Sequence, residues 1–164
     1  MTTKNSTLVS NFEASPIALN PAHQLHGVKR VAQGTVALAV GDVGANDIVM
    51  LAPIPSNASI TSIMLASDDL DTGTTLTADV GLYTKAGVVV DVDAYASVTT
   101  DFRAATAFKD FAFEARDINK CGQRVWEDAG ATSDPKDYYY VVVTFAAAGN
   151  QAGDLSFQIE YVVN

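Results

Sequence analysis

Few residues of this chain have the types and spacing that chemistry needs, and the densest group is the run Asp68-Asp69-Leu70-Asp71-Thr72-Gly73. Neighbouring carboxylates can hold calcium, or share a proton as in the aspartic proteases. This run lacks the alternating ligands and the twelfth-position glutamate that complete a calcium loop. An aspartic protease pairs two Asp-Thr-Gly segments, whereas this chain has one. We therefore interpret the run as a solvated turn.

The other candidate ligands or nucleophiles are His23, His26 and the single cysteine, Cys121. Zinc sites need further Cys or His residues at characteristic spacings, and none accompanies the two histidines. Cys121 cannot form a disulfide within the chain, so it is either a small buried apolar residue, the commoner case, or a reactive thiol. Phosphate-binding loops and nucleophile elbows are also missing. The sequence nominates no catalytic residue, metal site or cofactor, and predicts that the protein is not an enzyme.

The composition describes an acidic chain of one-domain length. Its 164 residues include 10 Lys and Arg against 19 Asp and Glu, which gives a net charge of −9. This balance argues against a nucleic-acid partner and against anionic membranes, because both require clustered basic residues. The N-terminus lacks the apolar segment of a signal peptide, and no apolar run approaches the roughly 20 residues of a membrane span. We therefore expect synthesis in the cytoplasm.

Residues 1–25 predict an extended arm, because they show neither the strand nor the helix period. The arm contains Pro16 and Pro21 among polar residues, and isolated apolar side chains stand between them. It is either a frayed terminus or a strap that docks on a neighbouring subunit. Phe12 and Ile17 favour docking, since a purely solvated tail rarely carries such side chains.

Short segments with a period of two follow the arm and predict strands. Residues 36–40 and 60–65 are two of them, and residues 48–51 form a run that we expect to end at Pro53-Ile-Pro55. Residues 76–92 are expected to form a hairpin. Near the C-terminus we expect residues 138–145 and 155–163 to pair as antiparallel neighbours, since a glycine-containing turn separates them.

One region departs from this pattern. Residues 118, 121, 122, 125, 126 and 129 would share one helical face, so we place a short helix at about 119–128. Asp117 can cap this helix and Gly130 can end it. Residues 102–116 fit either a helix or a strand. Seven or eight short strands favour an antiparallel β-sandwich over residues 26–164.

The C-terminal third also carries a family resemblance. Residues 122–130, Gly-Gln-Arg-Val-Trp-Glu-Asp-Ala-Gly, are followed by Asp134-Pro135 and then by two strands. This order resembles small virion structural proteins of tailed bacteriophages, in which a Trp-Glu-x-Ala-Gly helix precedes an Asp-Pro turn and the last two strands. The middle of the chain is similar as well, so the resemblance covers about residues 26–164.

The resemblance implies a jelly-roll-like sandwich that serves as a capsid decoration (cement) protein. Such a protein would bind the outside of the mature head and stabilise joints between major capsid subunits. Its implied partners are the major capsid protein and further copies of itself, as a dimer or trimer, and its location is the virion exterior after synthesis in the host cytoplasm. Our candidate contact residues are Phe12, Ile17 and Leu19 in the arm, and Tyr83 as an exposed aromatic.

The alternative is a glycan-binding module associated with a tail or fibre. Residues 138–140 are three consecutive tyrosines in an expected strand. Tyr138 and Tyr140 would face one side and Tyr139 the other, so two would be core and one exposed. An exposed tyrosine ring can stack on a sugar.

Overall fold

The computed structural model describes residues 4–22 and 24–163, which contain eight strands and two short α-helices. The strands are β1 (Lys29–Leu38), β2 (Ile48–Pro55), β3 (Ala58–Ser67), β4 (Thr77–Tyr83), β5 (Val89–Thr99), β6 (Thr106–Asp110), β7 (Tyr138–Ala147) and β8 (Gly153–Val163). The helices are α1 (Thr7–Phe12) and α2 (Val125–Asp128), with 3-10 turns η1 (Val40–Asp42), η2 (Asp101–Arg103) and η3 (Ile118–Lys120).

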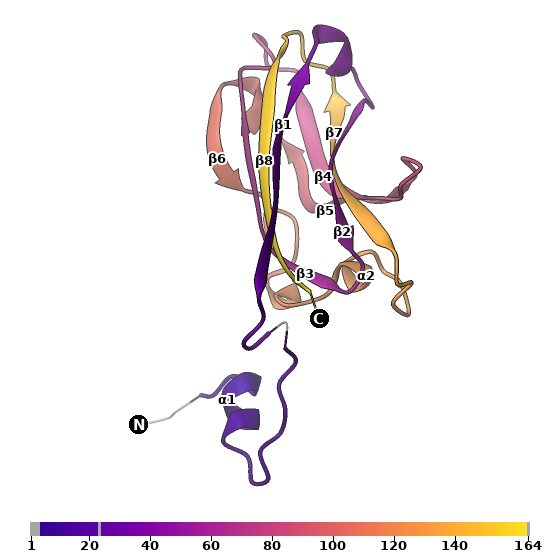
Figure 1. The fold of residues 1–164 in the computed structure, drawn as a ribbon. Helices are drawn as coiled ribbons and strands as arrows, with labels where there is room; N and C mark the ends of the chain where they lie inside the picture. Colours follow the sequence, from indigo (N-terminus) through magenta and orange to yellow (C-terminus); the bar gives the residue numbers. More distant parts are fainter. Residues whose placement is uncertain (1–3, 23, 164) are drawn as a thin grey trace.

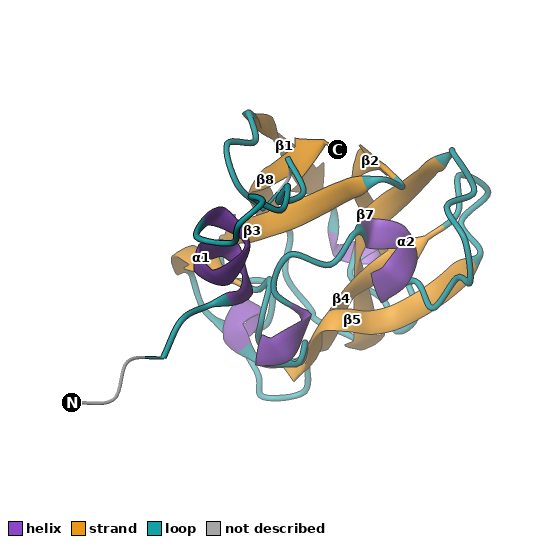
Figure 2. Ribbon diagram, turned by 90° about the horizontal axis from the view of Figure 1, so that it is seen from below, coloured by secondary structure: helices purple, strands orange, loops and turns teal. Residues whose placement is uncertain are grey.

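The strands form two antiparallel four-stranded sheets, in the orders β1-β8-β3-β6 and β2-β7-β4-β5. Figures 1 and 2 show the two sheets packed as layers. Strands 1 and 8, 2 and 7, 3 and 6, and 4 and 5 are paired, as expected when one long antiparallel hairpin is rolled up. This is the topology of a jelly roll, and it confirms the predicted all-β sandwich.

The rolled-up arrangement of the strands explains which of the predicted strand pairs occur. The hairpin predicted over residues 76–92 is confirmed as the pair β4–β5, because the tip of the roll is where consecutive strands stay side by side. The predicted pairing of residues 138–145 with residues 155–163 is wrong. These segments form β7 and β8, which lie in opposite sheets and face each other across the core.

β2 ends at Pro55, within the Pro53-Ile-Pro55 segment where its end was expected. The prolines do not stop the ladder before that point, because Pro53 lies opposite Tyr140 and Pro55 opposite Tyr138 of β7. β2 pairs with no other strand in the described part of the chain, so it is a sheet edge. Proline is tolerated on an edge strand because the missing amide donor can face away from the ladder.

The predicted helix near 119–128 is present only at its C-terminal end, as the four-residue α2. Residues 118–120 form the separate turn η3, and Gly122 between the two has a φ of +83°. This left-handed conformation interrupts a helix. The ambiguous residues 102–116 resolve into η2, β6 and irregular chain.

Alternating side chains from both sheets build the core. The inward-facing core residues of β7 and β8 are Val141, Val143, Phe145, Leu155, Phe157 and Ile159. Burial of each such side chain contributes about 1.5–3 kcal/mol to folding. At the β6 end of the sandwich, the rings of Phe102 and Phe111 stack with their centroids 5.6 Å apart.

Candidate functional site

The arm is a small folded unit rather than an extended chain throughout. Its helix α1 begins after Ser6, whose hydroxyl accepts a hydrogen bond from the amide of Val9. The chain then returns alongside the helix. The Asn11 side chain donates to the Asn20 side chain (2.8 Å), and Asn20 donates to the Leu8 carbonyl (3.0 Å). Side-chain amides therefore hold the arm together.

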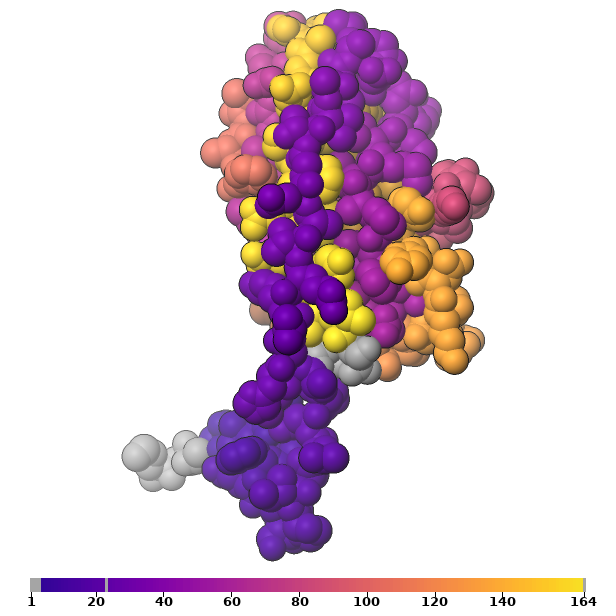
Figure 3. Space-filling view, viewed as in Figure 1, coloured from indigo at the N-terminus to yellow at the C-terminus, as the bar shows by residue number. Residues whose placement is uncertain are grey.

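The larger apolar side chains of the arm lie on its outside. Phe12 is 63% exposed, Ile17 64% and Leu19 94%. Figures 1 and 3 show the arm as a lobe that projects beyond the sandwich from the start of β1. A lobe with polar bonds within and apolar side chains outside has a surface suited to being covered by a partner.

The base of the arm lies against the sandwich. Thr7, Leu8 and Gln24 from the arm line a cleft of about 430 Å³ together with residues of β3 and of the chain between β6 and β7. Cys121 lines the same cleft and is exposed, so its interpretation as a buried apolar residue is wrong. Ile118 is also exposed, at 87%. The predicted helical face that would have buried both residues does not form.

Tyr83, the fourth candidate contact residue, is not exposed. It is 2% accessible, and its hydroxyl shares a hydrogen bond of 2.7 Å with the Thr144 hydroxyl. The cause is local, because β5 crosses close over the outer face of β4. A Cβ on Gly81 would overlap the backbone of Asp91 and Val92. In this structure Tyr83 is a packing residue, and its selection as an exposed aromatic is corrected.

A buried charged cluster fixes the long connection between β6 and β7, residues 111–137. Arg116 contacts Asp128 at 2.8 Å, and the side chains are only 1% and 2% exposed. The Tyr95 hydroxyl donates to the same carboxylate at 3.3 Å. The Arg116 guanidinium also stacks 4.9 Å from the Phe113 ring centroid. Burial raises the pKa of Asp128 to about 6, although the Arg116 charge partly offsets this effect.

The acidic run 68–73 is a turn, as expected, but its centre is not solvated. Asp71 is buried, and its carboxylate accepts hydrogen bonds from the amides of Gly73, Thr75 and Leu76. These bonds, led by that from Leu76, lower the pKa of Asp71. The carboxylate therefore organises the turn into β4.

No metal site is evident in the described residues. His23 lies outside them, and residues 4–22 and 24–163 contain no group of three or more His, Cys, Asp or Glu side chains that could hold a metal ion. None of the helices within those ranges is long and apolar enough to cross a membrane.

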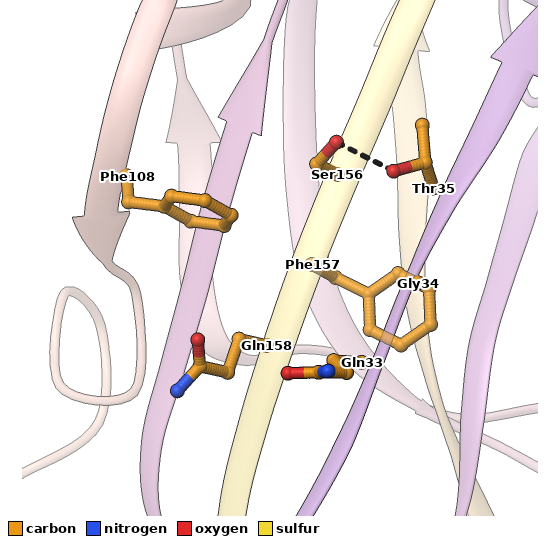
Figure 4. A pocket seen from close by; sticks show the side chains of 7 residues that line it. All are labelled: Gln33, Gly34, Thr35, Phe108, Ser156, Phe157 and Gln158. Atoms are coloured by element: carbon orange, nitrogen blue, oxygen red, sulfur yellow. Dashed lines mark hydrogen bonds between the residues drawn. The ribbon is translucent and has the colours of Figure 1, made fainter.

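The outer face of the β1–β8 pair carries an open groove of about 490 Å³. Figure 4 shows Gln33 and Gln158 side by side, and the ring of Phe108 of β6 directed toward β8 at the edge of the groove. The Thr35 and Ser156 hydroxyls are joined by a hydrogen bond of 2.8 Å. The groove is polar but uncharged, and Phe108 supplies an exposed ring at its edge.

The tyrosine strand divides differently from the expectation. Tyr139 packs against the core, Tyr140 is half-buried and Tyr138 is exposed. The sequence predicted two tyrosines in the core and one exposed, whereas the structure has one against the core and two at or near the surface. The period of two holds in β7, but its assignment to the two faces was reversed.

Comparison with known proteins finds two similar structures. A chain of the "Cyanophage Pam1 capsid asymmetric unit" is 19% identical, with 100% of both chains covered and a TM-score of 0.57. A chain of the "Capsid of Ralstonia phage GP4" is 22% identical, with 90% of this chain and 92% of that chain covered and a TM-score of 0.60. No family model and no curated protein matches the sequence. At these identities the likeness establishes the fold.

Proposed function

We propose that this chain is a structural component of a bacteriophage capsid. The observation that carries the proposal is the likeness in fold, over the whole chain and arm included, to a chain of the Pam1 capsid. The GP4 capsid contains a second chain of similar fold. The sequence points the same way, because its motifs resemble those of small virion proteins and nominate no catalytic residues.

We infer further that the protein decorates the shell, binding the outside of the mature head across joints between major capsid subunits. The arm is the element that would dock. Phe12, Ile17 and Leu19 expose apolar surface that a contact with the shell would remove from water. Because a shell offers many equivalent joints, modest contacts repeated around it can stabilise the whole particle.

Binding to shells tests this proposal. The full-length protein is expected to co-sediment with expanded shells of its phage and to raise the temperature at which they disrupt. It should also be present in purified virions in hundreds of copies. Absence from virions, together with failure to bind expanded shells, would rule the decoration role out. Three or six copies would point to the tail.

A triple variant tests the arm itself. Replacing Phe12, Ile17 and Leu19 with serine should lower shell binding at least tenfold and leave the melting temperature of the free protein unchanged. Val88→Ser is the matched control, because Val88 is similarly exposed but lies at the β4–β5 turn. Equal binding by the triple variant and the control would show that the arm is not the docking element.

Glycan binding by a tail- or fibre-associated module is the second candidate, and the groove beside Phe108 is the observation that favours it. Uncharged amide and hydroxyl groups beside an exposed ring suit the hydroxyls and apolar faces of a sugar. A glycan array should then show signal for the wild type that Phe108→Ala removes and Tyr138→Ala does not. An array with no signal would dismiss this candidate.

A further inference from the structure

The four edge strands of the sandwich differ in how they are protected. An unprotected edge offers free amide and carbonyl groups to a further strand, so proteins usually block it with proline, bulges, charges or short length. β2 carries Pro53 and Pro55. β5 has three register shifts against β4, and β6 is only five residues long with charged Lys109 and Asp110 at its end.

β1 has none of these devices over most of its length. It pairs with β8 without a register shift over ten residues, from Lys29 opposite Val162 to Leu38 opposite Gly153. It contains no proline, and its only charged residues, Lys29 and Arg30, stand at its start. β1 is therefore a long and regular edge.

The free side of β1 is also uncovered. Within the described residues β1 is bonded to β8 alone, and residues 29–38 make no backbone hydrogen bond outside that ladder. Seven of its ten residues are exposed, and Figure 3 shows the strand running along the surface. One row of its amide and carbonyl groups thus remains available for a ladder with another chain.

The charges flanking β1 are self-complementary. At one end of the strand Arg30 is exposed next to Lys29, which forms an ion pair with Glu160 of β8, and exposed Asp42 follows the other end. Between Glu13 and Asp42 the chain has no carboxylate side chain, although its net charge is −9. Two copies can therefore approach along β1 without bringing acidic residues together at the centre.

We propose that β1 pairs antiparallel with β1 of a second copy around a two-fold axis near Thr35, joining the two β1-β8-β3-β6 sheets into one. With the axis at Thr35, position 29 lies opposite position 41 of the partner copy, next to Asp42. The basic start of each strand then meets the acidic end of the other. The contact is isologous, so each copy contributes the same surface.

Introducing a positive or a negative charge at Thr35 tests this pairing. Thr35 is exposed on the outer face of β1, and its counterpart in the second copy would lie opposite or diagonal to it. In sedimentation velocity between about 1 and 100 µM, the wild type should form dimers. Thr35→Lys and Thr35→Glu should each raise the dissociation constant at least tenfold through like-charge repulsion, and an equimolar mixture of the two should restore dimers.

Ala107→Lys and Ala107→Glu are the matched controls, because Ala107 is exposed on β6 at the opposite edge of the same sheet. They should leave the dimer intact, and circular dichroism should show all four variants folded. A monomeric wild type, or a Thr35→Lys dimer as stable as the wild type, would overturn the proposal. If Thr35→Lys instead weakened shell binding by a monomeric wild type, the edge would belong to a shell subunit. The outcome in free solution is independent of whether the protein binds capsids.

Discussion

Two irregular parts of this molecule carry apolar and aromatic side chains but are fixed in opposite ways. The β6–β7 connection buries one ion pair, Arg116 with Asp128, and it is anchored to the sandwich by bonds such as that from the Ser59 hydroxyl to the Gln123 carbonyl. The arm keeps its hydrogen bonds within itself and turns Phe12, Ile17 and Leu19 outward. The connection is therefore fixed by buried polar contacts with the sandwich, whereas the arm is held by its own bonds and leaves its larger apolar side chains exposed.

The largest expected effect is loss of the buried pair in the connection. Arg116→Ala leaves an uncompensated carboxylate in the interior and should lower the free energy of unfolding by about 3–5 kcal/mol. Arg124→Ala is the control, because its pair with Glu127 is about one-third exposed and should contribute less than about 1 kcal/mol. Urea unfolding at pH 7.5 measures both. Similar losses for the two variants would contradict the role given to burial.

The second prediction concerns pH. Because burial raises the pKa of Asp128 from 3.8 to about 6, the folded state favours the protonated carboxyl, and this contribution is lost as pH rises from about 4 to about 6. The stability of the wild type relative to Asp128→Asn should therefore fall by about 2–3 kcal/mol between pH 4 and pH 7. A relative stability that rises over this range would mean that the attraction of Arg116 outweighs desolvation.

The third prediction concerns the turn at Asp71, where three backbone amides converge on one carboxylate. Asp71→Asn replaces one acceptor oxygen with an NH2 group, which would face backbone amides that also donate. The variant should therefore melt at a lower temperature than the wild type at pH 7. Since the pKa of Asp71 is lowered, its contribution is present above about pH 4 and is lost below that value. Asp69→Asn is the control with the smaller expected effect, because Asp69 accepts a single amide bond, from Asp71, which the remaining side-chain oxygen can still accept.

The smallest effect on stability is expected in the arm. Serine at Phe12, Ile17 and Leu19 removes no core contact, so the free energy of unfolding should change by less than about 0.5 kcal/mol. Differential scanning calorimetry of the free protein checks this. A large loss would place these side chains in the stabilising framework and would remove the contrast between arm and connection.

The sequence predicted the class of fold better than it predicted which strands pair. The period of two in residues 76–82 identified a strand and its hairpin correctly, because both depend on neighbouring residues. The predicted pairing of β7 with β8 is wrong because, away from the β4–β5 hairpin, rolling places consecutive strands in opposite sheets, and no local pattern encodes that choice. The exposure of Phe12, Ile17 and Leu19 agrees with expectation, whereas their role in an interface stays a prediction.

The errors at the candidate site have local causes. Tyr83 was selected as exposed, but a bulged neighbouring strand covers it where Gly81 leaves room. Cys121 and Ile118 were assigned to a helical face that the left-handed Gly122 interrupts. Gly122 was the residue in the sequence that could have indicated this interruption. No sequence pattern could have indicated the buried Arg116–Asp128 pair, because its two residues meet only through tertiary packing.

The ladder between β1 and β8 also has a consequence for synthesis of the chain. Within the described residues the first strand is bonded only to the last, and β8 is the strand that joins β1 to β3. Until residues 153–163 have left the ribosome, this sheet lacks the strand that links its edge to its middle. β1 must then wait unpaired on the nascent chain, so this half of the sandwich can form only after β8 has been synthesised, more than a hundred residues later.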